Sequence, residues 1–291
     1  MIIIAIHYIL SLCAISLFSQ ETCETVFNDK PEIFIIGTIH SMHFNPEYHY
    51  SLIDIQAQIC ALQPDLVCGE ITPEAYEQAM EGYFPPEAAF LAQMATRLNY
   101  RFEPVDWRLD YATQLKAEEE YPKSVLEKVS SFAKTYFAKF KESGSSSVYD
   151  DIHNEMNLAI VDSVFEKIIG ADQIAVIAHG NWSERNRRIV ENGLAAARNA
   201  RRIVFVFGSD HIPQIRRQLE VLGYKVQIPA RQFEPFNNFK VSDEVIGRWQ
   251  RNLENLKLIR ERKIQVTEDD YQKLINSRRI EDLELAIQKS T

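Results

Sequence analysis

Several well-known signatures of enzyme sites are missing from this 291-residue chain. It contains no G-x-G-x-x-G, no Walker A sequence, no G-x-S-x-G and no H-E-x-x-H. These absences argue against dinucleotide-binding, P-loop, serine-nucleophile and zincin sites. C-x-x-C is absent as well, so neither a zinc ribbon nor a thioredoxin-like site has support. Any chemistry must come from other patterns.

An excess of positive charge is also lacking. The chain has 32 Lys and Arg residues against 41 Asp and Glu, which gives a net charge of -9 and a pI of about 5.4. Nucleic-acid-binding surfaces are normally basic, so we expect no nucleic-acid partner. Apolar residues make up 46% of the chain, enough for a sizeable core. The length suits one large α/β domain or two smaller ones.

The first twenty residues, 1–20, contain no Asp, Glu, Lys or Arg, and Ile2 to Phe18 is almost wholly apolar. An apolar core followed by polar residues is typical of a secretory signal peptide, although the usual positive charge near its start is missing. We therefore predict export to the periplasm or out of the cell. Residues 21–291 would then form a single domain with no stable membrane span. The alternative is an uncleaved N-terminus that anchors the protein as a transmembrane helix.

Cysteine is scarce, with four residues in the chain. Cys13 would leave with the signal peptide, so Cys23, Cys60 and Cys68 remain. One disulfide among these three is compatible with an oxidising compartment. In the alternative, Cys60 on a helix and Cys68 on a strand are small buried hydrophobic residues.

One short pattern occurs twice. Ile33 to Ile36 is an apolar run that leads into Gly37-Thr38-Ile39-His40, and the run 203–207 leads likewise into Gly208-Ser209-Asp210-His211. Continuous apolar, β-branched runs of this length are typical of buried parallel strands. We expect the first glycine to allow a tight turn. Both histidines should lie just past the carboxyl ends of strands, where open α/β sheets bind ligands. The repetition favours a functional role for the two histidines over capping or structural hydrogen bonding.

An acidic residue follows the next predicted strand. Residues Ser51–Leu62 have the periodicity of a helix, and Asp65 to Gly69 are predicted to form a strand that ends at Glu70. Strand, helix and strand make a right-handed βαβ unit. If its strands are parallel, His40 and Glu70 emerge at the same edge of the sheet. The alternative for Glu70 is a solvated loop carboxylate.

Three further residues near these strand ends are candidates for the site. His43 closely follows the first motif and could add a ligand. Asp106 follows a weaker strand at 102–105, and its alternative role is the N-cap of the next helix. Asp210 lies inside the second motif, where it places a negative charge beside His211.

A basic sequence follows another apolar run. We predict a strand at Gln173–Ala178 and then a helix that opens at Glu184-Arg185-Asn186. Arg185 and Asn186, at the start of this helix, are well placed to hold an anion or a carbonyl together with free backbone N–H groups. We expect Arg185, and not Arg187 or Arg188, to hold the anion. Arg187 points to nearly the opposite side of the helix from Arg185, whereas Arg188 lies closer and is the competitor of Arg185 for this role.

The remaining segments are predicted to be mostly helical. A helical insertion at about 108–170 includes one long helix from Asp110 to Lys141. A last strand lies within Gly223 to Ile228, and a C-terminal helical extension covers about 241–291. The predicted fold class is therefore α/β, with a central, largely parallel or mixed sheet.

The two G-x-x-H motifs, the strand-end Glu70 and the Glu184-Arg185-Asn186 sequence together resemble the TraB / Tiki / GumN superfamily. The similarity runs from the first predicted strand to Gly223-Tyr224, and it departs at Ser209-Asp210, where small residues are usual. It implies a pseudo-repeated α/β fold with a site built from His40, Glu70, Arg185, Asn186 and His211. It also implies hydrolysis. Tiki-type members are metal-dependent proteases, erythromycin-esterase relatives are hydrolases without an obvious metal, and a more distant relative binds haem.

Two hydrolytic mechanisms fit these residues. In the first, His40, Glu70 and His211 hold a divalent ion (manganese, cobalt or zinc) that activates water and polarises a carbonyl. In the second there is no metal, and one of the two histidines is a general base that Glu70 orients. Arg185 and Asn186 would then stabilise the oxyanion. A peptide or small-molecule substrate is expected in both. The alternative is a non-catalytic protein that binds haem or another ligand through the same histidines.

Overall fold

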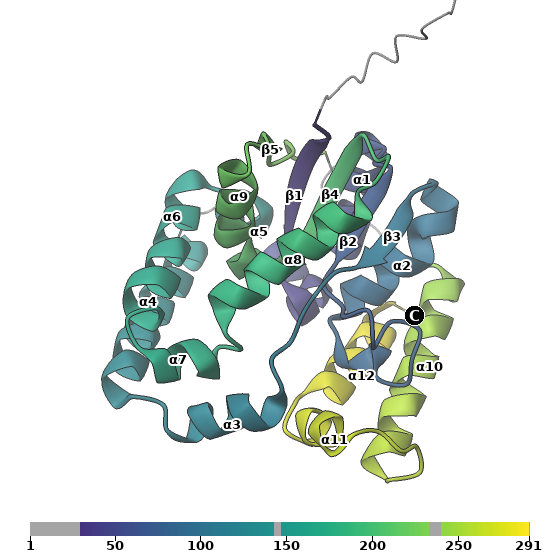
Figure 1. The fold of residues 1–291 in the computed structure, drawn as a ribbon. Helices are drawn as coiled ribbons and strands as arrows, with labels where there is room; N and C mark the ends of the chain where they lie inside the picture. Colours follow the sequence, from purple (N-terminus) through teal and green to yellow (C-terminus); the bar gives the residue numbers. More distant parts are fainter. Residues whose placement is uncertain (1–29, 143–146, 233–239, 291) are drawn as a thin grey trace, which may run out of the picture.

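Figure 1 shows the computed structural model of the chain, which describes residues 30–142, 147–232 and 240–290. The predicted signal peptide and Cys23 lie outside these ranges. Within them, no helix is both long enough and apolar enough to cross a membrane. Cys60 is an exposed free thiol and Cys68 a buried one.

The strands are β1 (Glu32–Thr38), β2 (Leu66–Gly69), β3 (Arg101–Pro104), β4 (Arg202–Gly208) and β5 (Val226–Gln227). The helices before β4 are α1 (Leu52–Leu62), α2 (Pro86–Leu98), α3 (Tyr111–Glu119), α4 (Lys123–Glu142), α5 (Val148–Ile152), α6 (Glu155–Val164), α7 (Gln173–Ala178) and α8 (Trp182–Ala196). The later helices are α9 (Ile212–Val221), α10 (Asp243–Arg260), α11 (Glu268–Ile275) and α12 (Arg279–Ser290).

The five strands are all parallel and lie in the order β3-β2-β4-β1-β5. The predicted α/β class with a parallel sheet is thus confirmed, as are the strands before both G-x-x-H motifs. β1 and β2 are not neighbours, because β4 lies between them: Ile203 pairs with Ile33 on one side and with Leu66 on the other. Since all strands run the same way, His40 and Glu70 still emerge at the same edge.

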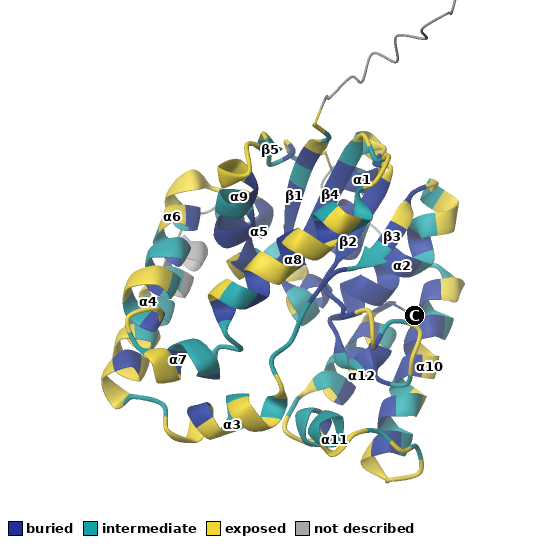
Figure 2. Cartoon of the chain, viewed as in Figure 1, coloured by how far each residue is buried: buried dark blue, intermediate teal, exposed yellow. Residues whose placement is uncertain are grey.

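Helices cover both faces of the sheet, and the alternation of side chains along β4 assigns them to the two faces. Ile203, Phe205 and Phe207 pack with α8 and α9, whereas Val204 and Val206 pack with α1, α2 and α10. All five side chains are at most 1% exposed, and the strand is dark blue in Figure 2. A strand buried on both faces explains why this run is apolar at every position rather than alternately.

The chain leaves the neighbouring strands β1 and β4 in opposite directions. β1 continues through α1, on one face of the sheet, to β2, whereas β4 continues through α9, on the other face, to β5 (Figure 1). Diverging connections of this kind define a topological switch point, which is where open α/β sheets form their ligand crevices. The two G-x-x-H motifs follow these two strands.

The strand predicted at Gln173–Ala178 is wrong, because these residues form α7. The Asp172 side chain caps this helix by accepting the N–H of Ala175 at 3.0 Å. Ala175 is buried against Val125 of α4 and Ile169 rather than against the sheet. A six-residue apolar run has too little periodicity to separate a short helix from a strand. The capping aspartate was the better signal.

The long helix predicted from Asp110 to Lys141 is two helices, α3 and α4, which are separated at Tyr121-Pro122. Proline disfavours helical backbone in the preceding residue and lacks an N–H donor. The interruption therefore lies where the sequence places its proline.

The predicted C-terminal extension packs into the same core as the sheet. Trp249 of α10 is 0% exposed, and its Nε1–H donates to the carbonyl oxygen of Pro86, at the start of α2, at 3.0 Å. The last helix, α12, packs against the 3-10 turn His40–Phe44. The extension thus reaches the edge of the sheet where the first motif lies.

Candidate active site

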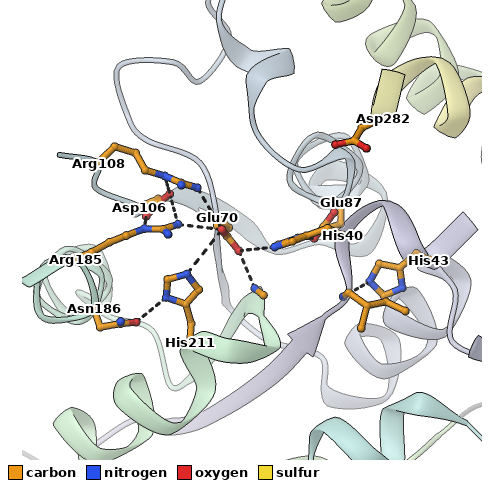
Figure 3. Close-up of polar contacts among 12 residues, drawn as sticks. His40, His43, Glu70, Glu87, Asp106, Arg108, Arg185, Asn186, His211 and Asp282 are labelled. Atoms are coloured by element: carbon orange, nitrogen blue, oxygen red, sulfur yellow. Dashed lines mark hydrogen bonds and ion pairs between the residues drawn. The ribbon is translucent and has the colours of Figure 1, made fainter. Parts of the chain in front are cut away.

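Glu70 lies at the centre of a polar cluster at the carboxyl edge of the sheet (Figure 3). It is 4% exposed. Its Oε1 accepts from Nη2 of Arg185 at 2.9 Å and Nη2 of Arg108 at 3.3 Å, and its Oε2 accepts from the backbone N–H of Gly208 at 2.7 Å. Burial opposes ionisation, but the positive charges of His40, Arg185 and Arg108 hold the pKa of Glu70 below its ordinary value. The carboxylate is therefore charged.

The two motif histidines face this one carboxylate from opposite directions. Nε2 of His40 lies 4.0 Å from Oε2 of Glu70, and Nε2 of His211 lies 3.9 Å from Oε1 (Figure 3). The structure thus brings together the three residues that were predicted to share a site, although the two motifs are far apart in the sequence.

A buried carboxylate holds His40. Nδ1 of His40 lies 2.6 Å from Oε1 of Glu87. Glu87 is in the first turn of α2 and is 2% exposed. A carboxylate can only accept, so His40 donates Nδ1–H to it and turns Nε2 toward Glu70. Burial opposes the charged imidazole, but the carboxylates of Glu87 and Glu70 raise the pKa of His40 above 6.5. The backbone of His40 is left-handed, with φ 52°, a conformation that is uncommon outside glycine and recurs at functional sites.

His211 is held as a neutral imidazole. Its Nδ1 lies 2.7 Å from Oδ1 of Asn186, whose Nδ2 donates to the carbonyl of Trp182 at 2.8 Å and so fixes the orientation of the amide. Nδ1 therefore carries the proton, and Nε2 is an acceptor that faces Glu70. The Trp182 ring stacks on His211 with centroids 4.1 Å apart. Burial, followed by the charge of Arg185, holds the pKa of His211 well below 6.5.

Arg185 binds carboxylates rather than facing the solvent as an anion site would. Its Nε and Nη2 donate to Oδ1 and Oδ2 of Asp106 at 2.8 and 2.9 Å, and Nη2 also reaches Glu70. Asp106 is 1% exposed and also accepts from Nε of Arg108 at 2.8 Å. The N-cap alternative for Asp106 is therefore wrong, since α3 is capped by Asp110. Arg185, which is itself held by Asp106, positions Glu70.

Asn186, the other residue that was predicted to stabilise the oxyanion, does not have this role either. This side chain is 0% exposed, and both ends of its amide are occupied by His211 and Trp182, so it orients His211 instead. Arg187 and Arg188 lie on the exposed face of α8 and pair with Glu184, as expected of solvated residues.

His43 and Asp210, two further predicted site residues, are not part of the cluster around Glu70. Both ring nitrogens of His43 are engaged by backbone: Nε2 accepts the N–H of Ile39 at 3.1 Å, and Nδ1 donates to the carbonyl of Tyr50 at 2.9 Å. Burial lowers the pKa of His43 to about 4. His43 is therefore a structural residue that points away from Glu70, not an additional ligand (Figure 3). Asp210 is exposed and lies on the wall of the adjoining cavity.

The motif glycines allow close approach rather than a tight turn. Neither has a positive φ. A Cβ at Gly37 would lie 2.5 Å from Cδ1 of Ile212, and one at Gly208 would lie 2.7 Å from Nε2 of His40. The predicted turn at Gly37 is wrong. Gly208 is the position that lets His40 approach the end of β4.

A cavity of about 440 Å³ adjoins the cluster. Its polar wall contains His40, Glu70, Arg108, Arg185, Asp210, His211 and Arg279. Its apolar wall includes Met42, Tyr48, Ile152 and Trp182. Sequence reasoning missed Glu87, Arg108, Trp182 and Arg279. For Arg108 a signal existed, because it stands two residues after Asp106 at the end of a predicted strand.

The predicted metal ligands fit an ion poorly. Both imidazoles have their Nδ1 held by an acceptor, an arrangement also found around metal-bound histidines. However, the Glu70 oxygen nearest His211 already accepts from two guanidinium groups, whose positive charge would repel a cation. Among residues 30–142, 147–232 and 240–290, no three His, Cys, Asp or Glu side chains are arranged to hold a metal ion.

Fold and site together define an α/β protein with a composite polar site at the switch point of a parallel sheet. Comparison with protein-family models, with curated proteins and with solved structures gave no match. The resemblance to the TraB / Tiki / GumN superfamily therefore rests on the motif residues.

Proposed function

We propose that this protein is a hydrolase that cleaves an ester or amide bond, with His40 as the general base. The observation that carries the proposal is the His40–Glu87 pair. A buried carboxylate 2.6 Å from Nδ1 fixes the imidazole and leaves Nε2 facing a cavity that can admit a substrate. A base oriented in this way by a third group is the recurring arrangement of hydrolytic sites.

In the proposed reaction, Nε2 of His40 takes a proton from a water molecule, whose oxygen adds to the substrate carbonyl. The developing oxyanion lies toward Arg108, because the Arg108 side chain is 25% exposed and that of Arg185 only 8%. Both arginines also pair with Glu70 and Asp106, but Arg108 reaches Glu70 at the longer distance, 3.3 Å. Collapse of the tetrahedral intermediate breaks the bond to the leaving group, which receives the proton from His40. Glu87 and Glu70 stabilise the imidazolium that exists between these steps.

The resemblance to the TraB / Tiki / GumN superfamily supports hydrolysis, and the apolar N-terminus supports export as part of the same proposal. The haem alternative receives less support, because Nε2 of both motif histidines lies about 4 Å from the Glu70 carboxylate, in a wall that also carries arginines. The poor fit of the site to a cation favours the metal-independent mechanism over the metal-dependent one.

A chelator test separates the two hydrolytic mechanisms. Purified protein should cleave members of a panel of 4-nitrophenyl esters or fluorogenic peptides, and kcat/KM should be unchanged after dialysis against EDTA. Elemental analysis of the same samples gives the metal content. Loss of activity on chelation, with recovery on adding manganese, cobalt or zinc, would overturn the metal-free mechanism. Absence of cleavage across the panel would count against the hydrolase.

Gly208→Ala is expected to lower kcat/KM on the order of 100-fold, the scale of a misplacement of about 1 Å at a reacting group. The reason is that a Cβ would lie 2.7 Å from Nε2 of His40 and 3.3 Å from Oε2 of Glu70. Gly247→Ala in α10 is the control, since a Cβ there meets only Nη1 of Arg251 at 3.8 Å. Equal kinetics of the two variants would show that the close approach at Gly208 is unimportant.

A further inference from the structure

The negative and the positive side chains of the site differ in how far they are exposed. The carboxylates around His40 are almost inaccessible: the side chains of Glu70, Glu87 and Asp106 are 5%, 3% and 0% exposed. The accessible charged groups are mainly cationic: the side chains of His40, Arg108 and Arg279 are 35%, 25% and 22% exposed. Asp210 is the exposed carboxylate on the same wall. A ligand in the cavity therefore meets an excess of positive groups.

Arg279 differs from the other arginines of the cavity in how little it is engaged. Arg185 makes three hydrogen bonds of 2.8 to 2.9 Å to carboxylates. Among the residues that the structure describes, the Arg279 side chain has one contact to Asp282 at 3.4 Å and a distant approach to the ring of Tyr83 at 5.8 Å. Its guanidinium is therefore available to bind a group that enters the cavity.

Arg279 is also close to the reacting group. It is the first residue of α12, which packs against the turn that begins at His40, and its positive charge acts to lower the pKa of His40. An anion bound by Arg279 would thus lie beside the proposed base. Apolar residues also line this cavity, such as Met42 and Ile152, and they provide a surface for an aliphatic segment of the ligand.

We propose that Arg279 binds a carboxylate carried by the substrate itself. The substrate class is then an ester or amide whose acyl chain ends in a free carboxylate a few atoms from the bond that is cleaved. This inference rests on the proposed function, because it assigns the substrate of the same site. It also gives the C-terminal extension a direct role in specificity.

The binding test uses the products that two matched substrates would yield, glutarate and pentanoate, which differ in the second carboxylate. Isothermal titration calorimetry on the whole protein should show glutarate binding at least about tenfold more tightly, the scale of one charge-assisted hydrogen bond. Arg279→Gln should abolish the difference. Arg278→Gln should preserve it, because Arg278 is exposed and does not line the cavity. Equal binding of the two acids to the wild type, or no effect of Arg279→Gln, would overturn the inference.

The kinetic test uses 4-nitrophenyl hydrogen glutarate and 4-nitrophenyl pentanoate. Measured above the midpoint of the pH profile, where His40 is neutral in wild type and variant alike, Arg279→Gln should raise KM about tenfold or more for the glutarate ester. The KM for the pentanoate ester should change much less, because that ester lacks the second carboxylate. If the wild type cleaves both esters with the same kcat/KM, the hydrolase stands and the carboxylate site is refuted. If glutarate binds selectively through Arg279 but neither ester is cleaved, the carboxylate site stands and the hydrolase assignment loses its support.

Discussion

His40→Asn is expected to lower kcat/KM by about 10²- to 10⁴-fold, the contribution of a well-placed general base. Asparagine tolerates the left-handed backbone of this position, where φ is 52°. The substitution also removes the partner that lies 2.6 Å from the buried Glu87 carboxylate, so we expect some loss of stability as well. Steady-state kinetics and thermal unfolding of the purified variant measure the two effects separately.

His49→Asn is the matched control, because His49 is also left-handed, with φ 47°, but is exposed and lies outside the cavity of the site. It should retain wild-type kinetics. If His40→Asn retained them too, His40 would not be the base.

The pH profile tests how His40 is tuned. A general base works in its neutral form, and Glu87 and Glu70 raise the pKa of His40 above 6.5, so kcat/KM should rise with pH through a midpoint above 6.5. Glu87→Gln removes one of the raising charges, and the midpoint should move to lower pH while the maximal rate falls. A midpoint that stays in place in Glu87→Gln would show that another group controls the profile.

Four of the site residues found from the sequence closely follow a strand of the sheet. They are His40, Glu70 and His211 after buried strands and Asp106 after the edge strand β3. A parallel strand covered on both faces must be apolar throughout, so its end is easy to locate. His40, Glu70 and His211 stand at such ends, and a parallel sheet brings the ends of its strands to one edge. The same logic failed at Gln173–Ala178, where an apolar run packs against helices and has no strand partners.

The residues missed by sequence reasoning reach the site through tertiary packing. Glu87 looks like an ordinary acidic residue in the first turn of a helix, where the helix dipole favours negative charge. Only the packing of α2 beside the first motif gives it His40 as a partner. Arg279 starts a helix near the C-terminus, and its approach to the cavity depends on how α12 docks. Neither position could be inferred from local spacing.

The roles of Arg185 and Asn186 were misassigned for a related reason. A helix start with free N–H groups and an arginine is a reasonable anion site when it faces solvent. Here the arginine is drawn inward by two carboxylates, and its charge is already balanced. Arg185, which was expected to bind a ligand, is buried and instead positions Glu70.

Arg185→Met should reduce both stability and activity. The substitution removes a positive charge that pairs with the buried carboxylates of Glu70 and Asp106. Breaking a buried ion pair in this way lowers the free energy of unfolding by about 3 to 5 kcal/mol. The freed Glu70 should also shift relative to both histidines, which we expect to lower kcat/KM on the order of 100-fold. Arg187→Met on the same helix is the control. The side chain of Arg187 is 47% exposed, so this substitution should leave both stability and kinetics nearly unchanged.

The pH dependence of this stability loss distinguishes charge compensation from lost packing. In the wild type the folded-state pKa of Glu70 lies below its unfolded value, so its ion pairs stabilise the fold above about pH 4.3 and lose this effect as the pH falls through the folded pKa. In Arg185→Met the ionised carboxylate instead opposes folding at neutral pH and becomes neutral in acid. Urea unfolding should therefore show the largest difference between variant and wild type near pH 7, and a smaller one at pH 4. A difference independent of pH would mean that Arg185 acts through packing alone, and that Glu70 does not depend on its charge.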